Sequence, residues 1–196
     1  REDAQIVRSF KIRGAYNKIN KYKQYNSEFE VVTTSAGNHA QGVSLSCNKL
    51  KLNHTIFIPT STPKQKIEKI KYFGQHNLNL IIKGNNFDEC LDYSLQYANK
   101  KDALFIHPFD DDDIILGQST IAQEIHEMIT PDYILCGVGG GGLISGVGSY
   151  SKLINPSCKI IGIEPENANS MYESINSGSW KIAIFLSAKL INLGGF

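Results

Sequence analysis

The sequence has no long apolar run and no excess of charge of either sign. No hydrophobic stretch approaches the roughly 20 residues that a membrane-spanning helix needs, and the amino end REDAQIVRSF lacks the charged-then-apolar order of a signal peptide. Its 20 Lys and Arg residues against 19 Asp and Glu residues give a formal net charge of +1. The basic residues are scattered rather than grouped with aromatic residues. We therefore expect a cytoplasmic protein that binds neither membrane nor nucleic acid.

Cysteine is equally sparse. The four cysteines lie far apart, with no C-x-x-C pair, at Cys47, Cys90, Cys136 and Cys158. Structural zinc sites and redox motifs both need closely spaced cysteines. The sequence therefore predicts no metal site and predicts reduced, mostly buried thiols.

What the chain does have is enough apolar content for a core, with 41% hydrophobic and 20% charged residues. From residue 28 onward, short β-rich runs alternate with stretches of helical period. We expect strands near 28–35, 54–59, 79–84, 103–109, 132–138 and 159–165, with helices between them. One helix is expected to start with Thr62 and Pro63 as cap and first turn. Repeated βα units of this kind predict an α/β fold with parallel sheets covered by helices.

A glycine-rich turn lies between two of these elements, in the stretch GVGGGGLISG. Four consecutive glycines, Gly139 to Gly142, allow several backbone N–H groups to converge on one oxyanion. The stretch also fits the dinucleotide pattern G-x-G-x-x-G, with Glu164 placed where a ribose would bind. A phosphate site, a nicotinamide oxidoreductase and a plain strand-to-helix turn are the three interpretations that the glycines leave open.

A second polar turn, TTSAGNHAQG, comes directly before a helix. Ser35, Gly37 and Asn38 could hold a carboxylate through backbone N–H groups, with the Asn38 amide on a ring substituent. An ordinary helix cap explains the same residues, and His39 alone is typical of a structural histidine. Nothing in the spacing separates Lys11, in SFKIRGAYN, from a solvated surface lysine.

Six segments form one ordered set along the chain: REDAQIVRSFKIRGAYNKI, SAGNHAQGVSLSC, IFIPTSTPKQKIEKIKYFG, FIHPFDD, GVGGGGLISGVG and IIGIEPENANSM. Together they resemble threonine dehydratase (threonine ammonia-lyase), a fold-type II pyridoxal-phosphate enzyme family that also includes serine racemase. The resemblance runs from Arg1 to about Gly178. It implies two αβα domains with the cofactor in the cleft between them: a small domain at 24–113 and an incomplete large domain at 1–23 and 114–196.

The resemblance also implies roles for individual residues. Lys11 matches the Schiff-base lysine, with Phe10 packed beside the cofactor and Asn38 on its 3-hydroxyl group. The residues matching the phosphate loop are Gly139, Gly140, Gly141, Gly142 and Leu143. The residues on the turn that receives the substrate carboxylate are Ser35, Ala36, Gly37 and His39. Ser187, in the late segment KIAIFLSAKLINLGGF, matches a serine that bonds the pyridine nitrogen.

The implied activity is deamination of L-threonine, and of L-serine, by α,β-elimination to 2-oxobutanoate or pyruvate and ammonia. In the biosynthetic type this is the first step of isoleucine synthesis, and a homo-oligomer is expected at full length by analogy. Serine racemases carry Ser where this chain has Ala36. A methyl group cannot carry a proton, so a racemase-like enzyme is the disfavoured alternative.

Two of the chain's departures from the family pattern bear on metal binding and on the completeness of the fold. Some relatives hold a cation with counterparts of Glu164 and Ala168 and with an acid where this chain has Ser170, so we predict no metal and expect Glu164 to cap nearby N–H groups. After about Gly178 the chain passes almost directly to the late segment. We interpret it as a fragment with an internal deletion, in which the strands at 132–138 and 159–165 expose apolar faces. An inactive remnant is the corresponding alternative.

Overall fold

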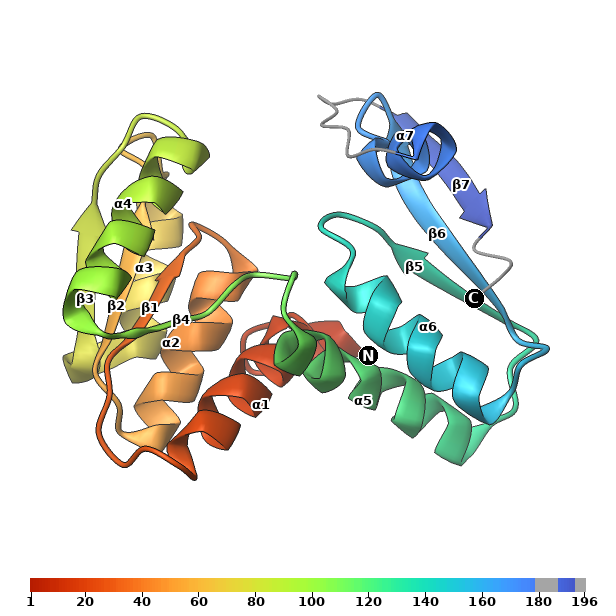
Figure 1. Cartoon of the computed structure of the whole chain (residues 1–196), viewed down its shortest axis with the longest axis horizontal. Coiled ribbons are helices and arrows are strands. Elements are labelled where there is room, and N and C mark those ends of the chain that lie inside the picture. Colours follow the sequence, from red (N-terminus) through yellow and green to blue (C-terminus); the bar gives the residue numbers. More distant parts are fainter. Residues whose placement is uncertain (179–186, 193–196) are drawn as a thin grey trace. The chain divides into compact units, whose positions relative to one another are not determined.

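The computed structural model describes residues 1–178 in full and the backbone of residues 187–192. The chain divides into two units, Arg1–Gly117 and Gln118–Phe196. The boundary between them falls within the long helix α5 (Asp112–Met128), which is labelled in Figure 1. This division does not test the predicted domain limits, which stay a prediction.

The first unit is built on a four-stranded sheet in the order β3-β2-β1-β4 (Figure 1). Its strands are β1 (Val31–Thr34), β2 (His54–Ile58), β3 (Leu78–Ile82) and β4 (Leu104–Phe105). All neighbouring pairs are parallel. Every residue of β1 and β2 is buried, which is typical of parallel strands covered on both faces.

Helices cover both faces of that sheet. They are α1 (Lys11–Lys23), α2 (Asn38–Leu50), α3 (Lys64–Gly74) and α4 (Phe87–Lys101), with 3-10 turns η1 (Glu2–Ala4) and η2 (Gln75–Asn77). Residues of α2 and α3 pack with Ile56 and Ile58 on one face. Residues of α4 pack with Val32 and Phe57 on the other. The predicted αβα arrangement is therefore confirmed for this unit, and the periodic pattern missed only the helix α1.

One helix start was predicted wrongly. Helix α3 begins at Lys64, with Pro63 at the cap position and no side-chain capping bond. The hydroxyl of Thr62 instead donates a hydrogen bond to the carbonyl oxygen of Pro59, at 2.7 Å. That bond closes the preceding turn, so the Thr62 hydroxyl is engaged before the helix starts.

The second unit has a three-stranded sheet in the order β5-β6-β7. Its elements are β5 (Tyr133–Gly137), α6 (Gly142–Ile154), β6 (Lys159–Glu166), α7 (Ser170–Ser177) and β7 (Ser187–Asn192). Strands β5 and β6 are parallel, whereas β6 and β7 are antiparallel. This pair is the exception among the described strands to the parallel arrangement that the sequence predicts.

Only one face of β5 is buried in the described part of this unit. Ile134 and Cys136 belong to an apolar cluster that residues of α5 and α6 complete. On the opposite face, the exposed fractions are 54% for Tyr133 and 58% for Leu135. The predicted exposed apolar face is confirmed for β5.

All four cysteines are free and buried, as predicted. Burial raises the pKa of the Cys90 thiol to about 11, because the thiolate is poorly solvated there. No helix in the described part of the chain is long and apolar enough to cross a membrane.

Candidate functional site

Lys11 is not a solvated surface lysine. It is the first residue of α1, is half-buried, and its Nζ atom donates a 2.6 Å hydrogen bond to the carbonyl oxygen of Pro108. The rings of Phe10 and Phe109 lie 5.4 Å and 5.9 Å from Nζ. Burial lowers the pKa of this amine. A larger neutral fraction makes the amine a better nucleophile and base than an exposed lysine.

A glycine in the neighbouring helix fixes where Lys11 stands. A Cβ atom added at Gly42, in α2, would lie 3.1 Å from the backbone carbon of Lys11 and 3.1 Å from the nitrogen of Ile12. The start of α1 can therefore rest directly on the backbone of α2. The backbone N–H of Lys11 also donates to Oγ of Ser9, at 3.3 Å.

The SAGN turn joins β1 to α2 within the same unit. Oγ of Ser35 accepts a 3.1 Å hydrogen bond from the N–H of Gly37, which occupies the cap position of α2. No side chain caps this helix, and Asn38 at its first position is exposed. The first N–H groups of a helix lack intrahelical acceptors and attract anions. The turn is thus suited to a carboxylate, with Ala36 beside it, and the ordinary-cap interpretation of Asn38 is wrong because its side chain makes no capping bond.

His39 follows this turn with its side chain turned into the protein. Only 3% of its surface is exposed, and Nε2 lies 3.0 Å from Oγ1 of Thr33 and 3.2 Å from the carbonyl oxygen of Ile106. Because a carbonyl oxygen only accepts, we assign the proton to Nε2. Burial, together with the nearby charge of Lys11, lowers the pKa of His39 to about 3. The imidazole therefore stays neutral near pH 7 and ties α2 to the ends of β1 and β4.

The glycine loop lies in the second unit, between β5 and α6. Gly141 occupies the cap position of α6 with φ of +86°, a backbone conformation that only glycine adopts without strain. A Cβ atom added at Gly139 would meet no atom within 4 Å. No side chain caps α6, and the first bond of its first turn runs from the N–H of Ser145 to the carbonyl oxygen of Gly141, at 2.9 Å. An open backbone at a helix start fits a phosphate group.

Glu164 acts within the protein rather than on a ribose. Its side chain is 1% exposed, and its two oxygens each accept a 3.0 Å hydrogen bond, from the N–H groups of Met171 and Tyr172. The predicted capping role is confirmed. The ribose contact required by the nicotinamide interpretation is contradicted, because both carboxylate oxygens are buried and engaged. Among the described residues, no three His, Cys, Asp or Glu side chains gather as metal ligands would.

The predicted set is thus placed in two groups. Lys11, Phe10 and the SAGN turn belong to the first unit, and the glycine loop with Leu143 belongs to the second. Ser187 begins β7, and its side chain, to which the predicted role belongs, lies outside the described residues. The sequence motifs did not identify the roles of Pro108, which contacts Lys11, and Thr33, which contacts His39. The segment FIHPFDD contained the first of these, but its role is visible only once β4 brings it to Lys11.

Comparisons with known proteins agree with this geometry. Residues 1–183 match the family described as pyridoxal-phosphate dependent enzyme. L-threonine dehydratase biosynthetic IlvA of Halalkalibacterium halodurans is 47% identical over 180 residues, which cover 91% of this chain and 43% of that protein. The same enzyme of Bacillus subtilis is 44% identical over 180 residues, with 91% and 43% covered. The chain thus spans less than half the length of these curated relatives.

Two solved structures share the fold. The processed form of threonine deaminase isoform 2 from Solanum lycopersicum has a TM-score of 0.86 at 42% identity, covering 92% of this chain and 52% of that one. Maize serine racemase has a TM-score of 0.86 at 32% identity, covering 95% and 56%. The fold is that of the fold-type II enzymes. The half-buried amine of Lys11 and the open glycine loop are features that its cofactor would use. The chain belongs to the family of pyridoxal-phosphate dependent enzymes.

Proposed function

We propose that this chain is the cofactor-binding part of an L-threonine dehydratase, which deaminates L-threonine, and also L-serine, to an oxo acid and ammonia. One observation carries the proposal: the half-buried amine of Lys11 is held 2.6 Å from the carbonyl oxygen of Pro108, in the unit that also carries the SAGN turn. The similarity to biosynthetic threonine dehydratases favours this substrate.

Pyridoxal 5'-phosphate, when bound, supplies an electron sink that stabilises negative charge at the Cα atom of the amino acid. We assign its covalent attachment, and then the removal of the Cα proton, to Nζ of Lys11. Burial lowers the pKa of this amine, so a larger fraction of it is neutral and able to act as a base than in an exposed lysine. The N–H groups of Gly139–Leu143 hold the phosphate, and Phe10, Asn38 and Ser187 complete the cofactor contacts.

The SAGN turn orients the substrate. The N–H groups at the start of α2 hold the carboxylate, and the neutral, buried His39 keeps that turn on the strand ends without exchanging protons itself. Ala36 offers no proton on the face opposite to Lys11. A single base favours elimination over two-base racemisation. In the elimination the Cα–H bond and then the Cβ–O bond break, and the hydroxyl group takes up a proton and leaves as water.

The wider setting is part of the same proposal. We propose a cytoplasmic enzyme that forms homo-oligomers at full length and catalyses the first step of isoleucine synthesis. The small domain at 24–113 and the large domain at 1–23 and 114–196 remain part of this proposal.

The test is spectroscopic first and chemical second. Adding pyridoxal phosphate to the purified chain should give the visible absorption band of a lysine-bound cofactor. Lys11→Ala should abolish the band, while Lys69→Ala, an exposed lysine on α3, should leave it unchanged. A parent protein without the band contradicts the proposal.

Product formation separates the remaining alternatives. Release of 2-oxobutanoate from threonine identifies an active dehydratase, and formation of D-serine from L-serine identifies a racemase. A band without either product identifies an inactive remnant that retains its cofactor.

A further inference from the structure

We propose that Glu164 is a positioning residue for the glycine loop, acting through α7 and the side chain of Met171. The inference rests on the proposed function only for the identity of the ligand, a phosphate. The coupling itself is a property of the second unit. The two hydrogen bonds that Glu164 accepts come from α7, and the proton-transfer steps described above make no use of this residue.

The first link is the bond between Glu164 and α7. Helix α7 has Asn169 at its cap position, yet the Asn169 side chain makes no capping bond and donates instead to Oε1 of Glu173, at 3.0 Å. The open N–H groups of Met171 and Tyr172 are satisfied by Glu164, from the end of β6, at 3.0 Å each. A buried carboxylate with two such bonds at a helix start is a strong attachment. Glu164 therefore fixes the start of α7 to the sheet.

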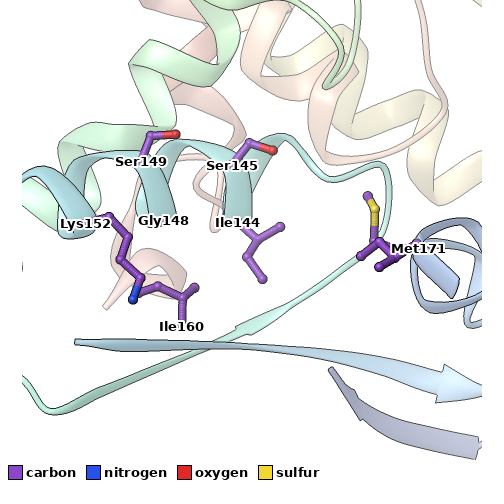
Figure 2. A pocket seen from close by; sticks show the side chains of 8 residues that line it. Ile144, Ser145, Gly148, Ser149, Lys152, Ile160 and Met171 are labelled. Carbon is purple, nitrogen blue, oxygen red and sulfur yellow. The ribbon is translucent and has the colours of Figure 1, made fainter. Parts of the chain in front are cut away.

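The second link is the contact between Met171 and the loop. A Cβ atom added at Gly141 would lie 2.8 Å from Cε of Met171. The methyl group of Met171 therefore occupies the space beside Gly141, the residue that turns the chain into α6. In Figure 2, Met171 extends from α7 toward the turn that enters α6. One of the two N–H groups that donate to Glu164 belongs to Met171 itself. The carboxylate therefore holds the same residue whose side chain contacts the loop.

The third observation is that, among the described residues, Met171 provides the one contact within 4 Å of a Cβ atom added at Gly141, apart from the chain neighbours of that glycine. Met171 stands at one end of a largely apolar cavity of about 320 Å³, which Ile144, Ile160 and Ile175 also line (Figure 2). Because the described residues provide no second contact at that position, a shift of α7 would remove this support from Gly141. A loop that must present several N–H groups to one anion binds best when its backbone is already ordered. Displacing Met171 should therefore loosen the loop and weaken its hold on phosphate.

Amide hydrogen exchange of the full chain without added cofactor tests the coupling. Peptides covering Gly139–Leu143 and α7 are compared between the parent and two variants. Glu164→Gln should accelerate exchange in both peptides by about tenfold, since one charged hydrogen bond is lost. Met171→Ala should accelerate only the loop peptide, because the cap on α7 remains. The exposed residues Glu127 and Met128 provide matched controls, as Glu127→Gln and Met128→Ala should change neither peptide.

A local stabilising role for Glu164 predicts a different pattern. In that case Glu164→Gln accelerates α7 alone, and this result would overturn the proposal. If Glu164→Gln does not fold, Met171→Ala decides by itself, because unchanged exchange in the loop contradicts the coupling.

Ligand binding supplies the second readout. The affinity for pyridoxal phosphate should fall about tenfold in each single variant, and the double variant should be no weaker than the weaker single one, because both act along one route. Additive losses would contradict the route. If the parent chain binds no pyridoxal phosphate, the proposed function fails, while the exchange experiment still decides on Glu164.

Discussion

The two units bury their sheets in different ways, and this difference affects how firmly each unit holds its part of the candidate site. In the first unit, Val31 and Val32 point to opposite faces of β1 and both are fully buried. In the second unit, β5 alternates between buried Ile134 and exposed Leu135. The lysine and the SAGN turn are therefore held by a sheet packed on both sides. The glycine loop follows a strand with one covered face among the described residues, and it depends more on a single local attachment.

The largest expected effect comes from removing the same kind of apolar side chain in each unit. Ile56→Ala, on fully buried β2, should lower the free energy of unfolding of the first unit by about 2–5 kcal/mol, because it leaves a cavity. Leu135→Ala, on the exposed face of β5, should cost under about 0.5 kcal/mol. Hydrogen exchange at the amides of each strand measures both. Equal costs would show that the exposed face of β5 is covered in solution.

Acidification should act on the first unit through its histidines. Burial lowers the pKa of His39 to about 3 and that of His54 to about 4, from 6.5. Below pH 6.5 these histidines bind protons in the unfolded chain but stay neutral in the folded chain. The free energy of unfolding therefore decreases as the pH falls toward 4. Between pH 7.5 and pH 5, the loss should be about 2 kcal/mol for each histidine.

Urea unfolding at the two pH values checks this loss. His39→Gln should reduce the loss of unfolding free energy between pH 7.5 and pH 5 by about 2 kcal/mol, which is the contribution of one histidine. This reduction is expected even if the substitution changes the stability at pH 7.5. A variant with the same pH dependence as the parent would show that His39 is accessible to protons in the folded state.

The sheets were predictable from sequence because their strands are continuous apolar runs between turns. Helix α1 was not, since its buried residues are Gly14, Ala15 and Ile19. Gly14 and Ala15 are too small to produce a periodic pattern of hydrophobic side chains. This helix packs by close backbone approach, so the sequence gives little indication that it is a helix.

The candidate site was predictable only in part. Motif resemblance singled out Lys11, whereas its spacing indicated a surface charge. The carbonyl of Pro108 lies 97 positions along the chain, and only the pairing of β4 with β1 brings it to the amine. The link from Glu164 to Gly141 was invisible for the same reason. Its middle member, Met171, carries no chemical group that a motif would identify.

A graded series of Gly→Ala substitutions within helices should give effects that decrease from one position to the next and include the smallest expected here. A Cβ atom at Gly117, in α5, would lie 2.5 Å from Cα of Gly14 and 2.7 Å from the carbonyl oxygen of Arg13, so α5 and α1 would have to separate. The same atom at Gly42 would lie 3.1 Å from the backbone of α1. At Gly148, in α6, the nearest atom is Cγ2 of Ile160 at 3.8 Å, an ordinary contact.

The order of the three costs follows from these distances. Gly117→Ala should destabilise by about 1–3 kcal/mol, because backbone atoms cannot yield as a side chain can. Gly42→Ala should cost less in stability but should weaken the lysine-bound cofactor band, since the displaced backbone carries Lys11. Gly148→Ala should be neutral or stabilising by up to about 1 kcal/mol, because alanine favours a helix more than glycine does. Urea unfolding and cofactor titration measure the series. A Gly42→Ala variant with full cofactor affinity would show that α1 can move without disturbing Lys11. The first unit, whose sheet is packed on both faces, would then be less rigid than its packing indicates.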